Sequence, residues 1–250
     1  MGEDLGFEFW LKAPPNPGEF VTSLMQEVRT LGFGYGGFFY DAAVREEPPI
    51  VRSDWDNRRH WQNDFVRALK VSSTQGWAAI ALQFDLPDVG DSGLMLYAGP
   101  KARWLPSEPR AKQDPGDAKW WVVRLEAKLG HFTVDSNMER YLAKAIIPLC
   151  RKMKPLLALG DVDDWGKLYR PTIHDLDSGM PRQACWFNYY SAYVIDKLGR
   201  RDWFEKFRQS KRWRVETYED GSAILIVTSI PQLDEREWAR SALGLRASSE

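Results

Sequence analysis

The sequence predicts an α+β fold, in which helices pack against a mostly antiparallel sheet and the C-terminal part forms a β-hairpin and a helix. Three observations support this class. The chain opens with a strand–helix–strand pattern. Two apolar runs separated by turn residues follow within residues 77–98. Later, Asp220-Gly221 stands between two strand-like runs.

The opening segment, Leu5 to Lys12, alternates in a way typical of a half-buried strand. Three prolines between residues 14 and 17 end it. Phe20 to Leu31 repeats apolar residues at helical spacing, with Gly32 as a C-terminal cap, and Tyr35 to Val44 is predicted to return as a strand. The first strand places Leu5, Phe7, Phe9 and Leu11 on one face and Gly6, Glu8, Trp10 and Lys12 on the other.

The middle of the chain combines short apolar runs with charged, proline-bearing segments. Residues 45–60 and 99–118 are predicted loops. A short helix is predicted from Trp61 to Val71. The predicted strands here are Trp77 to Phe84, Gly93 to Ala98 and Trp120 to Ala127.

A helix start is predicted at Ser136, because Glu139 stands three residues later with the spacing of a capping box. Apolar residues at helical spacing follow as far as Leu149. Pro148 is expected to kink this helix or end it early.

Residues 156–183 show little periodicity and are predicted to form a long loop. A structureless stretch of this length inside a compact domain is uncommon and often functional. This loop is therefore the first place to look for a site.

The C-terminal part contains a predicted hairpin of Trp213 to Glu219 and Ser222 to Ser229. Its Asp220-Gly221 link predicts a two-residue type I′ turn, in which both residues have positive φ. Before it, Ala184 to Tyr190 is a predicted strand, followed by a helix to about Leu198. After it, a helix capped by Asp234 and ended by Gly244 is expected.

No internal repeat or linker divides the chain. We expect one domain over residues 1–250, or two tightly packed halves of about 1–130 and 131–250.

Composition excludes several classes of protein. Hydrophobic residues are 44% and charged residues 28%, unlike an intrinsically disordered chain. No apolar run is long enough to span a membrane, and the acidic start does not resemble a secretory signal, so we expect a cytoplasmic protein. The net charge of −1 argues against a dedicated nucleic-acid binder. Two cysteines, Cys150 and Cys185, exclude a disulfide scaffold and are expected to be buried thiols.

Catalytic and metal-binding motifs are absent from the sequence. The glycine-rich run 32–37 lacks the lysine of a phosphate loop and lies between a helix and a strand. His60, His131 and His174 lack the spacing of metal ligands, so we expect no metal and no cofactor. The sequence favours a protein that is not an enzyme.

Two segments stand out as candidate contact surfaces. Arg200 to Arg214 carries seven basic and two acidic residues with aromatics between them, which suits either a solvated amphipathic helix or binding of phosphates. The other is the acidic stretch within 156–183, which suits a solvated turn or a contact with a basic partner. Its candidate partner-binding residues are Asp161, Asp163, Asp164, Trp165, Asp175 and Asp177.

The C-terminal motifs resemble those of the immunity protein 52 family. The resemblance covers about residues 156–230. The residues that carry it are Gly160 to Gly166, Trp186 to Ser191, Tyr193 to Arg200 and the hairpin Trp213 to Thr228.

The resemblance implies an antitoxin of bacterial polymorphic-toxin and type VI secretion systems (T6SS). Such a protein binds and neutralises a toxin with a restriction-endonuclease-like nuclease domain, without binding nucleic acid itself. An acidic loop bearing a tryptophan suits a nuclease's basic groove. Trp-rich faces also suit a homodimer.

Two other functions remain open from the residues alone. One is an enzyme with a carboxylate or histidine centre in the 156–183 segment, which predicts a deep polar pocket there. The other is a nucleic-acid-binding module that uses Arg200 to Arg214, which predicts a steep loss of affinity with salt.

Overall fold

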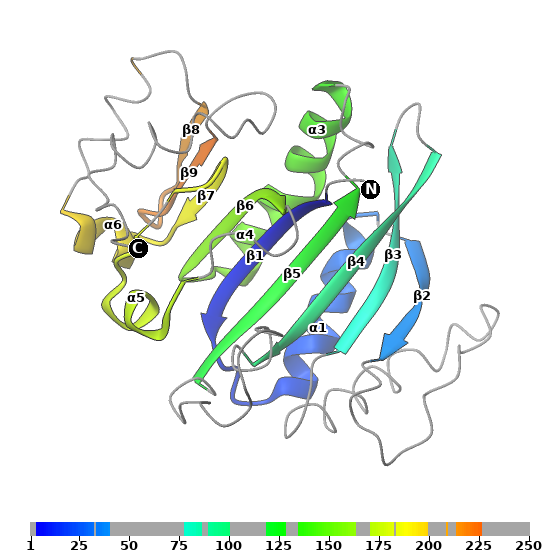
Figure 1. Ribbon diagram of the computed structural model, residues 1–250, viewed down its shortest axis with the longest axis horizontal. Helices are drawn as coiled ribbons and strands as arrows, with labels where there is room; N and C mark the ends of the chain where they lie inside the picture. Colours follow the sequence, from blue (N-terminus) through cyan, green and yellow to red (C-terminus); the bar gives the residue numbers. More distant parts are fainter. Residues whose placement is uncertain are drawn as a thin grey trace.

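The computed structural model describes residues 4–32, 34–40, 78–86, 90–100, 119–128, 135–163, 171–182, 184–199, 209 and 214–226 (Figure 1). Several predicted features lie outside these residues: the loop 45–60, the helix 61–71, the helix 234–244 and the predicted loop 99–118 except residues 99 and 100, which belong to a strand. None of the helices in the described ranges is long and apolar enough to cross a membrane.

The described strands form one antiparallel sheet, with helices against it, which confirms the predicted α+β class (Figure 1). Their order across the sheet is β2-β3-β4-β5-β1-β6-β7-β9-β8. The strands are β1 (Asp4–Lys12), β2 (Gly34–Tyr40), β3 (Ala78–Leu86), β4 (Gly90–Pro100), β5 (Trp120–Lys128), β6 (Leu157–Asp163), β7 (Phe187–Tyr190), β8 (Arg214–Thr217) and β9 (Ala223–Ile226).

The first strand, β1, lies inside the sheet between β5 and β6. All residues from Leu5 to Leu11 are buried, so the prediction of a half-buried strand was wrong. The strand face that carries Glu8 is buried as well. Glu8 forms an ion pair there with Arg124 of β5, with Oε1 and Nη1 2.8 Å apart. A buried charge of this kind is tolerated when it is paired.

Helix α1 (Pro17–Thr30) begins three residues before the predicted start. Asn16 caps it by accepting a hydrogen bond from the Glu19 amide, and Pro17 stands in the first turn, where no N–H is needed. Phe20 packs edge-on against Trp121 of β5, so α1 covers the sheet face that carries Leu11.

The second helical segment runs through α3 (Asp135–Tyr141), the π-helical turn η5 (Leu142–Ile146) and α4 (Ile147–Met153). The predicted capping box was wrong, because the helix begins at Asp135 and Ser136 lies within it. Pro148 does not end the helix. The π-helical turn directly before it widens the helix where the proline ring would clash with a carbonyl, and α4 continues for more than a turn.

An aromatic cluster holds these helices to the sheet. The ring of Phe7 meets Tyr141 of α3 edge-on, with centroids 5.8 Å apart, and contacts Trp186 and Phe187 in the same manner. Helices α1, α3 and α4 therefore lie on the same face of the sheet (Figure 1).

The predicted long loop 156–183 is wrong for its described residues. Leu157–Asp163 is strand β6, paired with β1 and β7, and Ile173–Ser178 is helix α5. Strand β6 is buried on both faces, which leaves no polar alternation to reveal it.

The C-terminal elements largely follow the prediction. Strand β7 leads into α6 (Ala192–Leu198), which Ser191 caps. The β8–β9 hairpin is confirmed, but its turn is not the predicted two-residue type, since only Gly221 has positive φ. Tyr218 and Ser222 pair across a three-residue loop, and the Gly221 amide donates to the Tyr218 carbonyl, 2.9 Å away. This is the hairpin in which a turn is followed by a left-handed residue.

Candidate interaction surface

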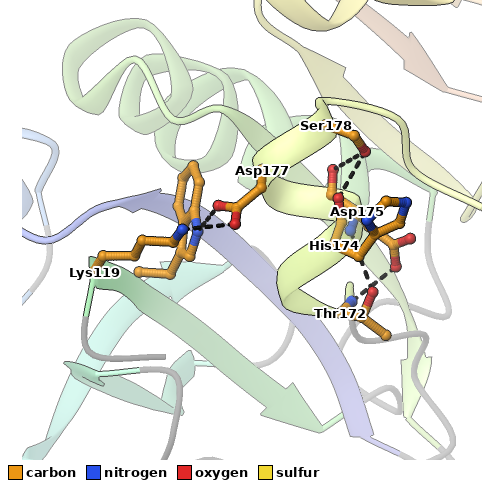
Figure 2. A network of polar contacts seen from close by, with 7 residues as sticks. Lys119, Thr172, His174, Asp175, Asp177 and Ser178 are labelled. Carbon is orange, nitrogen blue, oxygen red and sulfur yellow. Dashed lines mark hydrogen bonds and ion pairs between the residues drawn. The ribbon is translucent and has the colours of Figure 1, made fainter. Parts of the chain in front are cut away.

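Helix α5 is fixed at both ends by its own side chains (Figure 2). Thr172 and Asp175 form a capping box, in which each side chain accepts a hydrogen bond from the other residue's amide. Asp175 is 1% exposed and also forms an ion pair with Arg182 at 3.0 Å. Its carboxylate is therefore committed to holding the helix and does not lie on the surface that the sequence predicted.

Asp177 is the exposed acid of α5 (Figure 2). Its carboxylate lies 2.6 Å from Lys119 Nζ and accepts a hydrogen bond of 2.8 Å from Trp120 Nε1. These hydrogen bonds, from Lys119 first and Trp120 second, lower the pKa of Asp177 below its ordinary value. Asp177 is thus a fixed anion on the surface, and it ties α5 to the start of β5.

Asp161 lies inside the molecule, not on a loop. Its side chain is 1% exposed and accepts hydrogen bonds from the amides of Val162 and Trp186, at 2.8 and 3.2 Å. It therefore joins the end of β6 to the approach to β7. Burial removes Asp161, like Asp175, from any contact surface of the folded chain.

The other predicted contact residues are only partly placed by the structure. Asp163 ends β6, in register with Asp4 of β1, whereas Asp164 and Trp165 lie outside the described residues. Of the basic segment 200–214, only Gln209 and Arg214 are described. Arg214 lies on β8 and contacts two carboxylates, those of Glu139 and Glu216, each at 2.7 Å.

An exposed apolar patch lies where α5 ends and α6 begins. We call Gly179, Met180, Tyr193 and Lys197 the α5–α6 patch. Met180 and Tyr193 are 50% and 47% exposed and are the large hydrophobic side chains that stand out to solvent in the described part of the chain. Lys197 Nζ lies 5.5 Å from the centre of the Tyr193 ring, close enough for a cation–π contact.

Gly179 makes this arrangement possible. It ends α5 in the left-handed conformation, at φ +66°, and the Tyr193 ring covers it so closely that a Cβ would lie 2.6 Å from the ring. Tyr193 is thereby held against a backbone surface while half of its side chain remains exposed. The signal available in the sequence was that Tyr193 shares a helix face with polar Asp196 and Lys197.

Other reactive groups of the described chain are inert or isolated. Cys150 and Cys185 are buried and not joined by a disulfide, as predicted, and burial raises the pKa of Cys150. Among the described residues, no three His, Cys, Asp or Glu side chains lie together as metal ligands would. His174 is exposed on α5, whereas His60 and His131 lie outside the described ranges.

Comparison with solved structures gives a likeness that covers the whole chain. No protein-family model and no curated protein matches the sequence. Among solved structures, the chain is similar to Pseudomonas aeruginosa T6SS protein PA0821, with a TM-score of 0.53 and 12% sequence identity. The match covers 100% of this chain and 77% of that protein. At this identity, the likeness shows that the two proteins share a fold.

Proposed function

We propose that this chain is an immunity protein that binds a T6SS toxin and blocks it by direct contact, not by catalysis. The observation that carries the proposal is the shared fold with a T6SS protein of P. aeruginosa over the whole chain. The motifs of residues 156–230, which resemble the immunity protein 52 family, support the same setting.

The α5–α6 patch is the contact surface that suits this role best. Exposed Tyr and Met side chains are typical anchors of protein interfaces, where a few such residues provide most of the binding energy. Packing of Tyr193 on Gly179 fixes the ring before binding, so the complex would lose little conformational entropy there. Asp177, on helix α5, adds a fixed negative charge to the surface of this helix.

The toxin class follows from the family resemblance. We propose a nuclease toxin with a restriction-endonuclease-like domain, in which case a positively charged DNA groove is available to an acidic surface. Six residues of the acidic stretch were expected to bind the toxin. Among those whose exposure the structure describes, Asp177 is exposed.

The test is capture followed by a functional assay. A tagged chain is used to isolate partners from the source bacterium, and any captured effector is expressed and assayed for nuclease activity. We expect stoichiometric addition of this chain to abolish that activity and co-expression to rescue growth. A captured effector that is not inhibited, or nucleic acid that co-elutes and is lost at high salt, would overturn the proposal.

The patch is tested by two matched variants. Replacing Tyr193 with Ala should weaken the toxin complex by about 2 kcal/mol or more, whereas Tyr193→Phe keeps the ring on Gly179 and should bind nearly as the wild type. Equal affinity of Tyr193→Ala and wild type, with unchanged circular dichroism, would place the interface elsewhere.

A further inference from the structure

A polar cleft lies between the end of α4 and the β8–β9 hairpin. Its volume is about 560 Å³. Arg151 and Lys154 line it from the helix side, and Thr217, Tyr218, Asp220 and Ser222 line it from the hairpin side. We call it the α4–hairpin cleft. None of the residues singled out in the sequence as contact candidates lines it.

The hairpin wall of the cleft is rigid. Oδ1 of Asp220 accepts hydrogen bonds from the amide and the hydroxyl of Ser222, at 3.0 and 2.5 Å. These bonds, before any other cause, lower the pKa of Asp220. The Tyr218 hydroxyl donates to Glu216, 2.8 Å away. The wall therefore needs no rearrangement to receive a ligand.

The helix wall carries an unusual backbone. In the described part of the chain, positive φ outside glycine occurs at Lys154, where φ is 47°. It ends α4 in the left-handed conformation, where α5 and α6 end on Gly179 and Gly199. A glycine would fit this conformation with less strain, so the lysine retains its side chain at an energetic cost. That side chain lines the cleft.

The cations of the cleft have no carboxylate partner within ion-pair distance among the described residues. Arg151 instead lies over the Tyr218 ring, with its guanidinium carbon 5.4 Å from the ring centre. Stacking in this way holds a guanidinium in place while its N–H groups remain available. Glu219 also lines the cleft, and Asp220 is ionised, so the opposite wall is acidic.

From these charges we infer that the α4–hairpin cleft binds an acidic peptide segment of a protein partner. A carboxylate side chain suits the planar guanidinium of Arg151 and the ammonium of Lys154. The peptide N–H groups around it can donate to the Glu219 carboxylate and to the hydroxyl oxygen of Thr217. A phosphate dianion or a nucleic-acid backbone suits the cleft less well, because neither offers a row of N–H donors to the acidic wall of Glu219 and Asp220. The inference rests on the proposed function in that the segment is assigned to the toxin.

The cleft itself is tested with a defined probe, without any toxin. The full chain, labelled with ¹⁵N, is titrated with the capped peptide Gly-Glu-Gly-Glu-Gly and, separately, with Gly-Gln-Gly-Gln-Gly. We expect saturable shifts of the amides at 151–154 and 217–222 with the Glu peptide only. Equal binding of the Gln peptide, inorganic phosphate binding at these amides more tightly than the Glu peptide, or no saturation with the Glu peptide would overturn the inference.

Three variants separate recognition from folding and from overall charge. Arg151→Gln should weaken binding of the Glu peptide roughly tenfold, the loss typical of a charge-assisted hydrogen bond. Lys154→Gly should weaken it several-fold without lowering the melting temperature, because the glycine relieves backbone strain. Lys144→Gln removes an exposed charge on η5, outside the cleft, and should leave affinity unchanged. Equal loss in Lys144→Gln would mean that only net charge matters, which would overturn the inference.

The toxin then decides the assignment of the segment. If Arg151→Gln binds the captured toxin as tightly as wild type does, the acidic segment does not belong to the toxin and this part of the inference fails. Failure to capture any toxin with the wild-type chain would instead remove the proposed function, while the peptide titration would still decide whether the cleft recognises carboxylates.

Discussion

The carboxylate of Asp161 connects the end of β6 to the segment that enters β7, because it accepts hydrogen bonds from two backbone amides. Replacing Asp161 with Ala would leave these buried N–H groups without this acceptor, so we expect the free energy of unfolding to fall by about 2–3 kcal/mol. Urea unfolding followed by tryptophan fluorescence measures the loss. Asp161→Asn keeps one acceptor oxygen and should lose less. If the Ala variant were as stable as wild type, the two hydrogen bonds to the Asp161 carboxylate would contribute nothing to stability.

Asp177 is an exposed residue with a lowered pKa, and this gives it a pH-dependent contribution to stability. Its pKa in the folded state lies below the ordinary 3.8, so the contribution is present above pH 3.8 and disappears as the pH falls through the folded value. Because Lys119 and Asp177 are 52% and 41% exposed, we expect less than about 1 kcal/mol.

The comparison of wild type with Asp177→Asn tests this contribution. Wild type should be the more stable protein at pH 7, and the difference should shrink both with added salt and on acidification. If an NMR titration gave the Asp177 carboxyl a pKa of 3.8 or higher, the explanation would be contradicted.

The aspartates of the acidic stretch were all predicted to contact a partner, but the structure gives them different roles. Asp161 and Asp175 are buried acceptors, whereas Asp177 is a surface anion. Sequence spacing does not distinguish these roles. They depend on contacts with residues far along the chain, at the start of β5 and before β7. Tyr193 was missed for the same reason, since its exposure depends on how α6 packs against Gly179.

At the scale of elements, the junction of α5 and α6 depends on Gly179. Gly179→Ala adds left-handed strain and also places a methyl group against the Tyr193 ring. Gly199→Ala adds similar strain at φ +64° with nothing within 4 Å of the new methyl group, and it is the matched control. We expect both to destabilise the chain by about 1–2 kcal/mol, with a larger loss for Gly179→Ala.

The additional loss at Gly179 is measured by a double-mutant cycle with Tyr193→Ala. Removing the ring should remove the clash, so the two substitutions should be less than additive. Additive effects would mean that Tyr193 does not pack on Gly179.

Local patterns predicted most elements but misplaced their ends. Capping by Asn16 extended α1 beyond its apolar repeat, and the π-helical turn let α3 and α4 continue past Pro148. Strand β6 was read as a loop because a short apolar run buried on both faces shows no alternation. The hairpin was predicted correctly, although Asp220-Gly221 belongs to a longer turn.

At the scale of the whole molecule, β1 lies between β5 and β6, and a buried ion pair of Glu8 and Arg124 joins it to β5. Arg124→Leu would leave the Glu8 carboxylate buried without its cation, so we expect a loss of about 3–5 kcal/mol, partly recovered in the double variant with Glu8→Leu. Arg214→Leu removes an arginine with two carboxylate partners that is 39% exposed, and it should cost less than about 1 kcal/mol. Equal losses would contradict the importance of burial.

The expectation of one domain over residues 1–250 remains a prediction. The described sheet continues from β2 to β8 through β1, which favours cooperative unfolding. Fluorescence and circular dichroism should then report a single, coincident urea transition. Two separated transitions would favour two packed halves. The strand order itself was not predictable from local patterns, because β1 pairs with segments more than a hundred residues away.

This placement of β1 has a consequence for how the chain is made. Asp4 is synthesised long before its neighbours Lys128 and Asp163. At cellular elongation rates the interval is roughly six to thirty seconds. During that time β1, with its apolar residues and open backbone groups, has no partner strand and must be kept from associating with other nascent chains. A newly translated molecule therefore completes the β1–β5 pairing only after residue 128 has left the exit tunnel, and the β1–β6 pairing only after residue 163 has left it.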